Sequence, residues 1–165
     1  FKFEFFFRPK EEVFQGVLEE TARRYPQWHS TDVSLQKQLR QSPPRFGHAI
    51  LRSMAEAYYV VACALAAMGD EPVADRKAFI SILLLRGREM LLRRQISGES
   101  SVSSDLYTTA LKLADHRQLL NGGVGDVVEH REAFREETCR MLGAINLLQD
   151  CYNEAWFGPG GAGSA

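Results

Sequence analysis

The segment 48–68, HAILRSMAEAYYVVACALAAM, constrains the fold more than any other part of the chain. Its apolar residues recur at steps of three and four, which is the period of one helix face. From Ala57 onward the other faces become apolar too, and such a helix is either buried on all sides or a membrane span. This apolar run is shorter than the roughly 20 residues that a span needs. We therefore predict a central core helix whose polar end carries Arg52, Ser53 and Glu56.

Composition limits the classes of partner and site that need to be considered. The 165 residues correspond to one domain or most of one, and an apolar fraction of 45% suffices for a core. The net charge of −1 gives no global electrostatic reason to expect a nucleic-acid partner. The cysteines are odd in number, widely spaced and without a CxxC pair, so we expect buried thiols in a reducing compartment. They are Cys63, Cys139 and Cys151.

The first residues, FKFEFFF, alternate between apolar and charged side chains before becoming fully aromatic. This pattern predicts a β-strand. A single strand is not stable without partners to pair with, and the rest of the sequence contains no second convincing strand. We therefore expect residues 1–8 to form the edge of a sheet whose other strands lie upstream. Because the first residue is Phe rather than Met, we also expect the chain to be a piece of a longer protein.

The remainder of the sequence predicts helices. The expected fold is mainly α: a bundle-like helical domain over 9–157, one N-terminal strand, and a flexible tail over 158–165. The predicted helices cover 9–24, 32–39, 48–68, 73–94, 105–116 and 127–154, with proline, glycine and serine clusters between them. The first should bury Val13, Phe14, Val17, Leu18 and Ala22. The last should bury Thr138, Met141, Leu142, Ile145, Leu148 and Tyr152.

The polar end of the central helix is the first candidate site. Arg52 and Glu56 are one helical turn apart and can form an ion pair, and Tyr59 lies on a nearby face. An acid, a base and a phenol at one end of a buried helix could line a cleft or dock against another domain. The alternative is a satisfied structural network, and the sequence leaves both interpretations open.

The basic stretch 86–94 is the second candidate site. It carries Arg86, Arg88, Arg93 and Arg94 against a single acid. A basic amphipathic helix can lie on an anionic membrane surface or bind another anion. Alternatively, these arginines are solvated or paired on the outside of a core helix. No metal-ligand spacing, nucleotide-binding loop or GxSxG motif is present, so no metal or cofactor is expected.

Three segments in order resemble a known family. They are FEFFF at 3–7, ILRSMAEAYYVVA at 50–62, and ESSVS at 99–103 followed by ALKLA at 110–114. Together they are similar to the C-terminal part of bacterial and mitochondrial-type membrane glycerol-3-phosphate 1-O-acyltransferases. Within this resemblance, Tyr59 stands where the family commonly has arginine.

The resemblance implies acyl transfer from acyl-CoA or acyl-carrier protein to the 1-hydroxyl of glycerol 3-phosphate, the first step of phospholipid synthesis. The family's catalytic signature is His-x-x-x-x-Asp, in which histidine is the general base. None of the four histidines has aspartate five positions later; those positions hold Ser34, Ser53, Asn121 and Arg135. The resemblance thus implies a helical C-terminal domain that is inactive alone, supports the substrate cleft of its upstream acyltransferase domain, and lies peripherally at the cytoplasmic face of the membrane.

A second interpretation belongs to another class of protein. The chain could be an autonomous helical interaction module that forms a homodimer through its N-terminal strand. A dimer that becomes monomeric when residues 1–8 are removed would favour this module over a severed piece of an enzyme.

Overall fold

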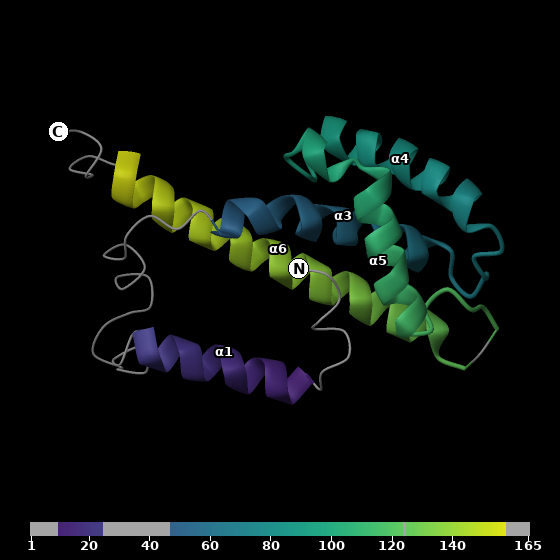
Figure 1. Cartoon of the computed structure of the whole chain (residues 1–165). Coiled ribbons are helices and arrows are strands. Elements are labelled where there is room, and N and C mark those ends of the chain that lie inside the picture. The colour runs from purple at the N-terminus through teal and green to yellow at the C-terminus, as the bar shows by residue number, and fades with distance from the viewer. Residues whose placement is uncertain (1–9, 25–46, 124, 158–165) are drawn as a thin grey trace. The chain divides into compact units, whose positions relative to one another are not determined.

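The computed structural model describes residues 10–24, 47–123 and 125–157, and these residues are mainly helical, as predicted. The helices are α1 (Lys10–Arg24), α3 (Gly47–Ala67), α4 (Arg76–Leu92), the 3-10 turn η1 (Glu99–Ser101), α5 (Ser104–His116) and α6 (Val127–Phe157) (Figure 1). The strand predicted over 1–8, the helix predicted over 32–39 and the tail over 158–165 lie outside the described residues. The chain divides into two compact units, of which Arg45–Asp150 is the larger.

Helix α3 is the central element of the larger unit. Its bounds agree with the predicted core helix to within one residue at each end. Val60, Val61 and Leu65 are completely buried although they point to different sides of the helix. Helices α4 and α5 both pack against α3 and against each other. Burial on most sides therefore explains the apolar residues of α3, while the stripe of Tyr59, Cys63 and Ala66 is only partly buried.

Helix α4 begins later than predicted because Asp75 caps it. The Asp75 carboxylate accepts hydrogen bonds from the backbone amides of Lys77 (2.8 Å) and Ala78 (3.1 Å). These bonds satisfy two of the amide groups that a helix leaves free at its N-terminus. The helix consequently starts at Arg76 instead of residue 73.

The contact between α4 and α5 depends on a glycine. Gly87 is buried in α4, and a Cβ atom at this position would collide with the hydroxyl of Tyr107 in α5. Tyr107 is completely buried, and burial raises the pKa of its phenol to about 12. Gly87 thus makes room for the largest side chain of the neighbouring helix.

The first half of α6 is fastened by Arg131, which is completely buried. Its Nε donates to the carbonyl of Leu119 (2.9 Å), after α5, and its Nη1 donates to the carbonyl of Gly69 (2.7 Å), after α3. Nearby, Arg117 and Glu137 form an ion pair at 2.6 Å. One buried arginine therefore joins the ends of three helices.

Several predictions of burial were wrong. Phe14 and Val17 of α1 are 60% and 56% exposed, and Met141 and Leu148 of α6 are also exposed. Helical periodicity identifies an apolar face, but it does not supply the partner that would cover that face. All three cysteines are free thiols, and Cys139 is exposed rather than buried. None of the described helices combines the length and apolar character needed to cross a bilayer.

Candidate functional site

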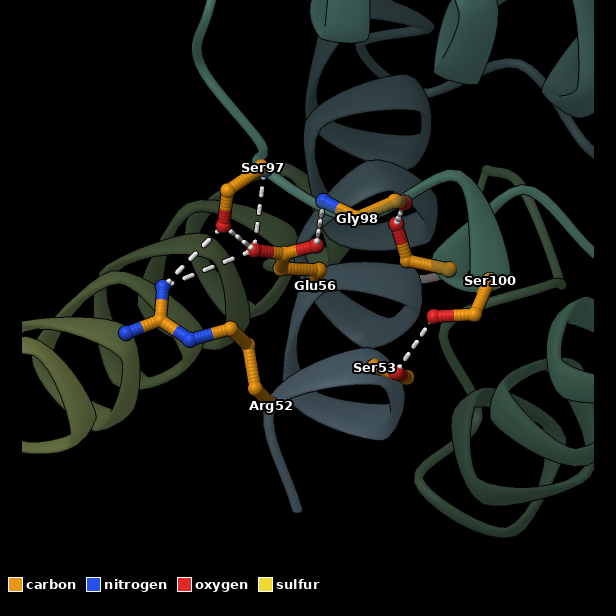
Figure 2. A network of polar contacts seen from close by, with 7 residues as sticks. Arg52, Ser53, Glu56, Ser97, Gly98 and Ser100 are labelled. Atoms are coloured by element: carbon orange, nitrogen blue, oxygen red, sulfur yellow. Dashed lines mark hydrogen bonds and ion pairs between the residues drawn. The ribbon is translucent and has the colours of Figure 1, made fainter. Parts of the chain in front are cut away.

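A buried carboxylate, Glu56, lies at the centre of the polar end of α3. Its side chain is only 2% exposed. Its Oε1 accepts hydrogen bonds from the backbone amide (3.0 Å) and the hydroxyl (2.6 Å) of Ser97, and its Oε2 accepts one from the amide of Gly98 (3.0 Å). Figure 2 shows the carboxylate facing this backbone. The loop that follows α4 is thereby attached to the central helix.

These hydrogen bonds determine the protonation state of Glu56. Burial raises the pKa of the carboxyl group, but the hydrogen bonds from the Ser97 hydroxyl and from the Ser97 and Gly98 amides outweigh that effect and lower the pKa. The net pKa lies below the ordinary value because the charged form accepts all of these bonds. Glu56 is therefore an ionised acceptor near neutral pH.

Arg52, one turn before Glu56, completes the centre of the network. Its Nη1 lies 3.7 Å from Glu56 Oε1 and donates to the Ser97 hydroxyl at 3.1 Å (Figure 2). The Ser97 hydroxyl thus accepts from the guanidinium while it donates to the carboxylate. The ion pair that the sequence predicted is present, and a hydroxyl from a distant loop bridges its two members.

The serines of the loop add further links to α3. Ser53 and Ser100 share a hydrogen bond of 2.7 Å between their hydroxyls, and the buried Ser101 hydroxyl donates to the carbonyl of Gly98. A Cβ atom at Gly98 would lie 3.4 Å from Glu56 Oε2, which is van der Waals contact, so the backbone of the loop passes close to the carboxylate. The sequence indicated only a small polar linker here, because hydrogen bonds between distant residues leave no local pattern.

A cavity of about 190 Å³ opens beside this network. Its polar lining comes from α3, from the end of α4 and the following loop, and from α6. The polar lining residues are Arg52, Glu56, Arg94, Gln95, Ser97 and Asn146. The cavity therefore unites two members of the first candidate site with one arginine of the second.

Tyr59 does not share this cavity. It lies beside Cys63, one turn further along α3, and burial together with this thiol raises the pKa of the phenol. The predicted trio is consequently divided: Arg52 and Glu56 belong to the polar network, and Tyr59 belongs to a separate, partly buried region.

The four arginines of the second candidate site have different environments. Arg86 is half-buried, and its Nε has no hydrogen-bond partner within the described part of the chain. Arg88 is exposed, Arg93 is paired with Glu89 at 2.7 Å, and Arg94 lines the cavity. The same helix exposes Ile82, Leu85 and Leu92 by more than half of their surface. We call the exposed side of α4 that carries Ile82, Leu85, Arg88 and Leu92 its outer face. This outer face is therefore both basic and apolar.

The residues that the structure describes contain no group of three or more acidic, histidine or cysteine side chains that could hold a metal ion. The chemistry of the site is that of a polar network beside a cavity with two guanidinium groups.

Comparison with known proteins relates the chain to one family. The family model described as the glycerol-3-phosphate acyltransferase C-terminal region matches residues 1–123. Proteins named plsB1, provisionally termed acyltransferases, from Mycobacterium bovis and Mycobacterium tuberculosis are 34% identical over 104 residues. That alignment covers 62% of this chain and 17% of each relative, so the chain corresponds to a small part of their length. No solved structure matches the chain.

Proposed function

Because the chain belongs to the family described as the glycerol-3-phosphate acyltransferase C-terminal region, we propose that it is the non-catalytic helical part of a larger acyltransferase. That enzyme would transfer an acyl group from acyl-CoA or acyl-carrier protein to the 1-hydroxyl of glycerol 3-phosphate. The chain would support the substrate cleft of an upstream catalytic domain and would help to seat the enzyme on the membrane.

The state of Glu56 carries the non-catalytic assignment. A general base works best when its pKa lies near the operating pH and when it can reach the proton that it removes. Glu56 has a lowered pKa, and both of its oxygens accept hydrogen bonds from the loop at Ser97 and Gly98. Such a carboxylate is suited to holding a loop in place beside a cleft and poorly suited to proton transfer.

The outer face of α4 supports the membrane role. Ile82, Leu85 and Leu92 are exposed there, Arg88 lies on the same helix, and Arg93, which is paired with Glu89, follows its last residue. An amphipathic helix with apolar and basic residues binds at the interface of an anionic membrane through apolar burial and electrostatic attraction. We assign this face to a lipid surface because its excess of arginine complements anionic headgroups.

Acyl-transfer assays test the enzymatic part of the proposal. We expect a longer protein that contains this chain to acylate glycerol 3-phosphate from acyl-CoA or acyl-carrier protein, and the 165-residue chain to transfer nothing. Transfer by the chain alone would overturn the non-catalytic role. A longer protein without transfer would overturn the acyltransferase assignment.

Cosedimentation with vesicles tests the membrane role. Wild-type protein should bind vesicles that contain phosphatidylglycerol more strongly than vesicles of phosphatidylcholine alone. Leu85→Glu should weaken this binding because it places a charge at the lipid contact. Leu147→Glu, which alters an exposed leucine of α6, is the matched control and should bind as wild type does. Equal vesicle binding by the two variants would instead favour a protein-interaction module. The same conclusion would follow if Leu85→Glu lost a dimeric state but kept its vesicle binding.

A further inference from the structure

Two of the three free cysteines lie on facing sides of α3 and α6. We propose that Cys63 and Cys139 are a redox pair, which a hydroperoxide oxidises to a reversible disulfide between the two helices. Redox-sensing cysteines are accessible thiols that often lie next to a second, resolving cysteine. This modification is separate from the acyltransferase and membrane roles, and it can be measured without either of them.

The register of α6 against α3 brings the two cysteines to the same level. At one end, Arg131 of α6 donates to the carbonyl of Gly69, which follows α3, at 2.7 Å. At the other end, Asn146 of α6 lines the same cavity as Arg52, near the start of α3. The two helices therefore run antiparallel (Figure 1). Cys139 lies about midway between Arg131 and Asn146, so it is opposite the middle of α3.

Helical periodicity places both cysteines on the sides of α3 and α6 that face each other. Residues three or four positions apart share one helix face, so Glu56, Tyr59 and Cys63 lie along one face of α3. By the same rule, Cys139 and Leu142 lie along one face of α6. Glu56 and Leu142 line one cavity. The two faces therefore point toward each other, and the thiols lie along the interface between them.

The surroundings of Cys63 agree with this placement. Burial raises the pKa of its thiol, and the nearby thiol of Cys139 raises it further. A hydrogen bond with Tyr59 and the positive charges of Arg86 and Arg135 lower this pKa, but by less. Guanidinium groups from α4 and α6 thus act on the thiol of α3, and cationic neighbours stabilise the thiolate, which is the reactive form.

The exposure of the two thiols assigns their roles in the oxidation. Cys139 is exposed and reacts first, whereas Cys63 is partly buried. The Cys139 thiolate attacks the hydroperoxide, whose O–O bond breaks, and becomes a sulfenic acid while an alcohol or water leaves. The sulfur of Cys63 then attacks the sulfenic sulfur, and the hydroxyl group leaves with the Cys63 proton as water. The two thiols together lose two electrons, which the hydroperoxide gains.

The disulfide would join α3 and α6 beside the polar network. Cys139 lies one turn before Leu142, and Cys63 lies two turns after Glu56, and both Leu142 and Glu56 line the cavity. Oxidation would therefore fix α6 against α3 next to this cavity, and a dithiol reductant would release it. In a reducing compartment such bonds are transient and serve redox sensing.

Peptide mapping by mass spectrometry, after treatment of the 165-residue chain with hydrogen peroxide, tests the pair. We expect a monomer in which Cys63 is joined to Cys139 while Cys151, which is buried, stays free. Dithiothreitol should restore all three thiols. Cys151→Ser is the matched control and should form the same disulfide at the same rate. In Cys63→Ser, the sulfenic acid of Cys139 should persist and react with dimedone.

Oxidation in concentrated urea separates the folded geometry from simple proximity along the chain. Cys139 is much closer in sequence to Cys151 than to Cys63. Shorter loops close at a smaller entropic cost, so in the unfolded chain the bond to Cys151 should predominate by about tenfold. In the folded chain the order should be reversed. The proposal is overturned if the folded chain forms no bond between Cys63 and Cys139, or if the folded and unfolded chains give the same mixture of disulfides.

Discussion

Glu56 is the residue whose change should reveal most about the site. In Glu56→Gln one carboxylate oxygen becomes an amide NH₂ group, which cannot accept a hydrogen bond from Ser97 or Gly98. A buried donor left without an acceptor costs about 1–3 kcal/mol, so the free energy of unfolding should fall by that amount in urea denaturation. Glu89→Gln is the control, because Glu89 is exposed and its ion pair with Arg93 should contribute at most about 1 kcal/mol.

The same residue predicts a pH dependence. The folded-state pKa of Glu56 lies below its ordinary value of 4.5. A carboxyl group with a depressed pKa stabilises the fold above its unfolded pKa, and this stabilisation is lost as the pH falls through the folded value. The melting temperatures of wild type and Glu56→Gln should therefore differ most above about pH 5 and converge in acid. A constant difference between pH 7 and pH 3 would contradict this role.

At the scale of elements, the close approach of α4 and α5 is the most sensitive contact. Alanine favours an isolated helix over glycine by about 1 kcal/mol, but Gly87→Ala would drive a methyl group into the Tyr107 hydroxyl. Overpacking of this kind costs about 1–3 kcal/mol. We expect a net loss of stability in chemical denaturation.

A second substitution shows whether the hydroxyl is the cause. Tyr107→Phe removes the oxygen, which has no hydrogen-bond partner within the described part of the chain. The double variant Gly87→Ala, Tyr107→Phe should recover most of the lost stability, and Tyr107→Phe alone should be neutral or stabilising. If the double variant is as unstable as Gly87→Ala, the steric explanation is wrong.

At the scale of the larger unit, Arg131 links the ends of three helices. Arg131→Met leaves the carbonyls of Gly69 and Leu119 without their charged donor. Hydrogen bonds to charged groups contribute about 1.5–3 kcal/mol each, so this variant should lose several times more stability than an exposed arginine of α6. Arg140→Met, which removes a long and exposed ion pair with Glu136, is that control.

Hydrogen exchange separates a local effect from a general one. In Arg131→Met the amides at the start of α6 and near Leu119 should lose protection before those of α3, because the arginine holds the helix ends and the apolar core holds α3. Uniform loss of protection throughout residues 45–150 would show that Arg131 is needed for the unit as a whole.

The sequence by itself determined the mainly helical fold and the bounds of its principal helices. Apolar spacing, proline and glycine act over a few residues, so α1 and α3 could be placed to within about one residue. The order of short motifs also identified the acyltransferase family that the comparison then matched. The ion pair of Arg52 and Glu56 was predictable for the same reason, because its members are one turn apart on a single helix.

Only the tertiary structure decided which faces are covered and which polar groups meet. Phe14 and Met141 fit apolar helix faces, yet both are exposed, because burial depends on a partner that periodicity cannot reveal. Glu56 accepts hydrogen bonds from Ser97, which lies 41 positions later in the sequence. Arg94 lines the same cavity as Glu56 because α4 ends beside α3. Contacts between distant residues arise from the packing of helices, which no local pattern of side chains specifies.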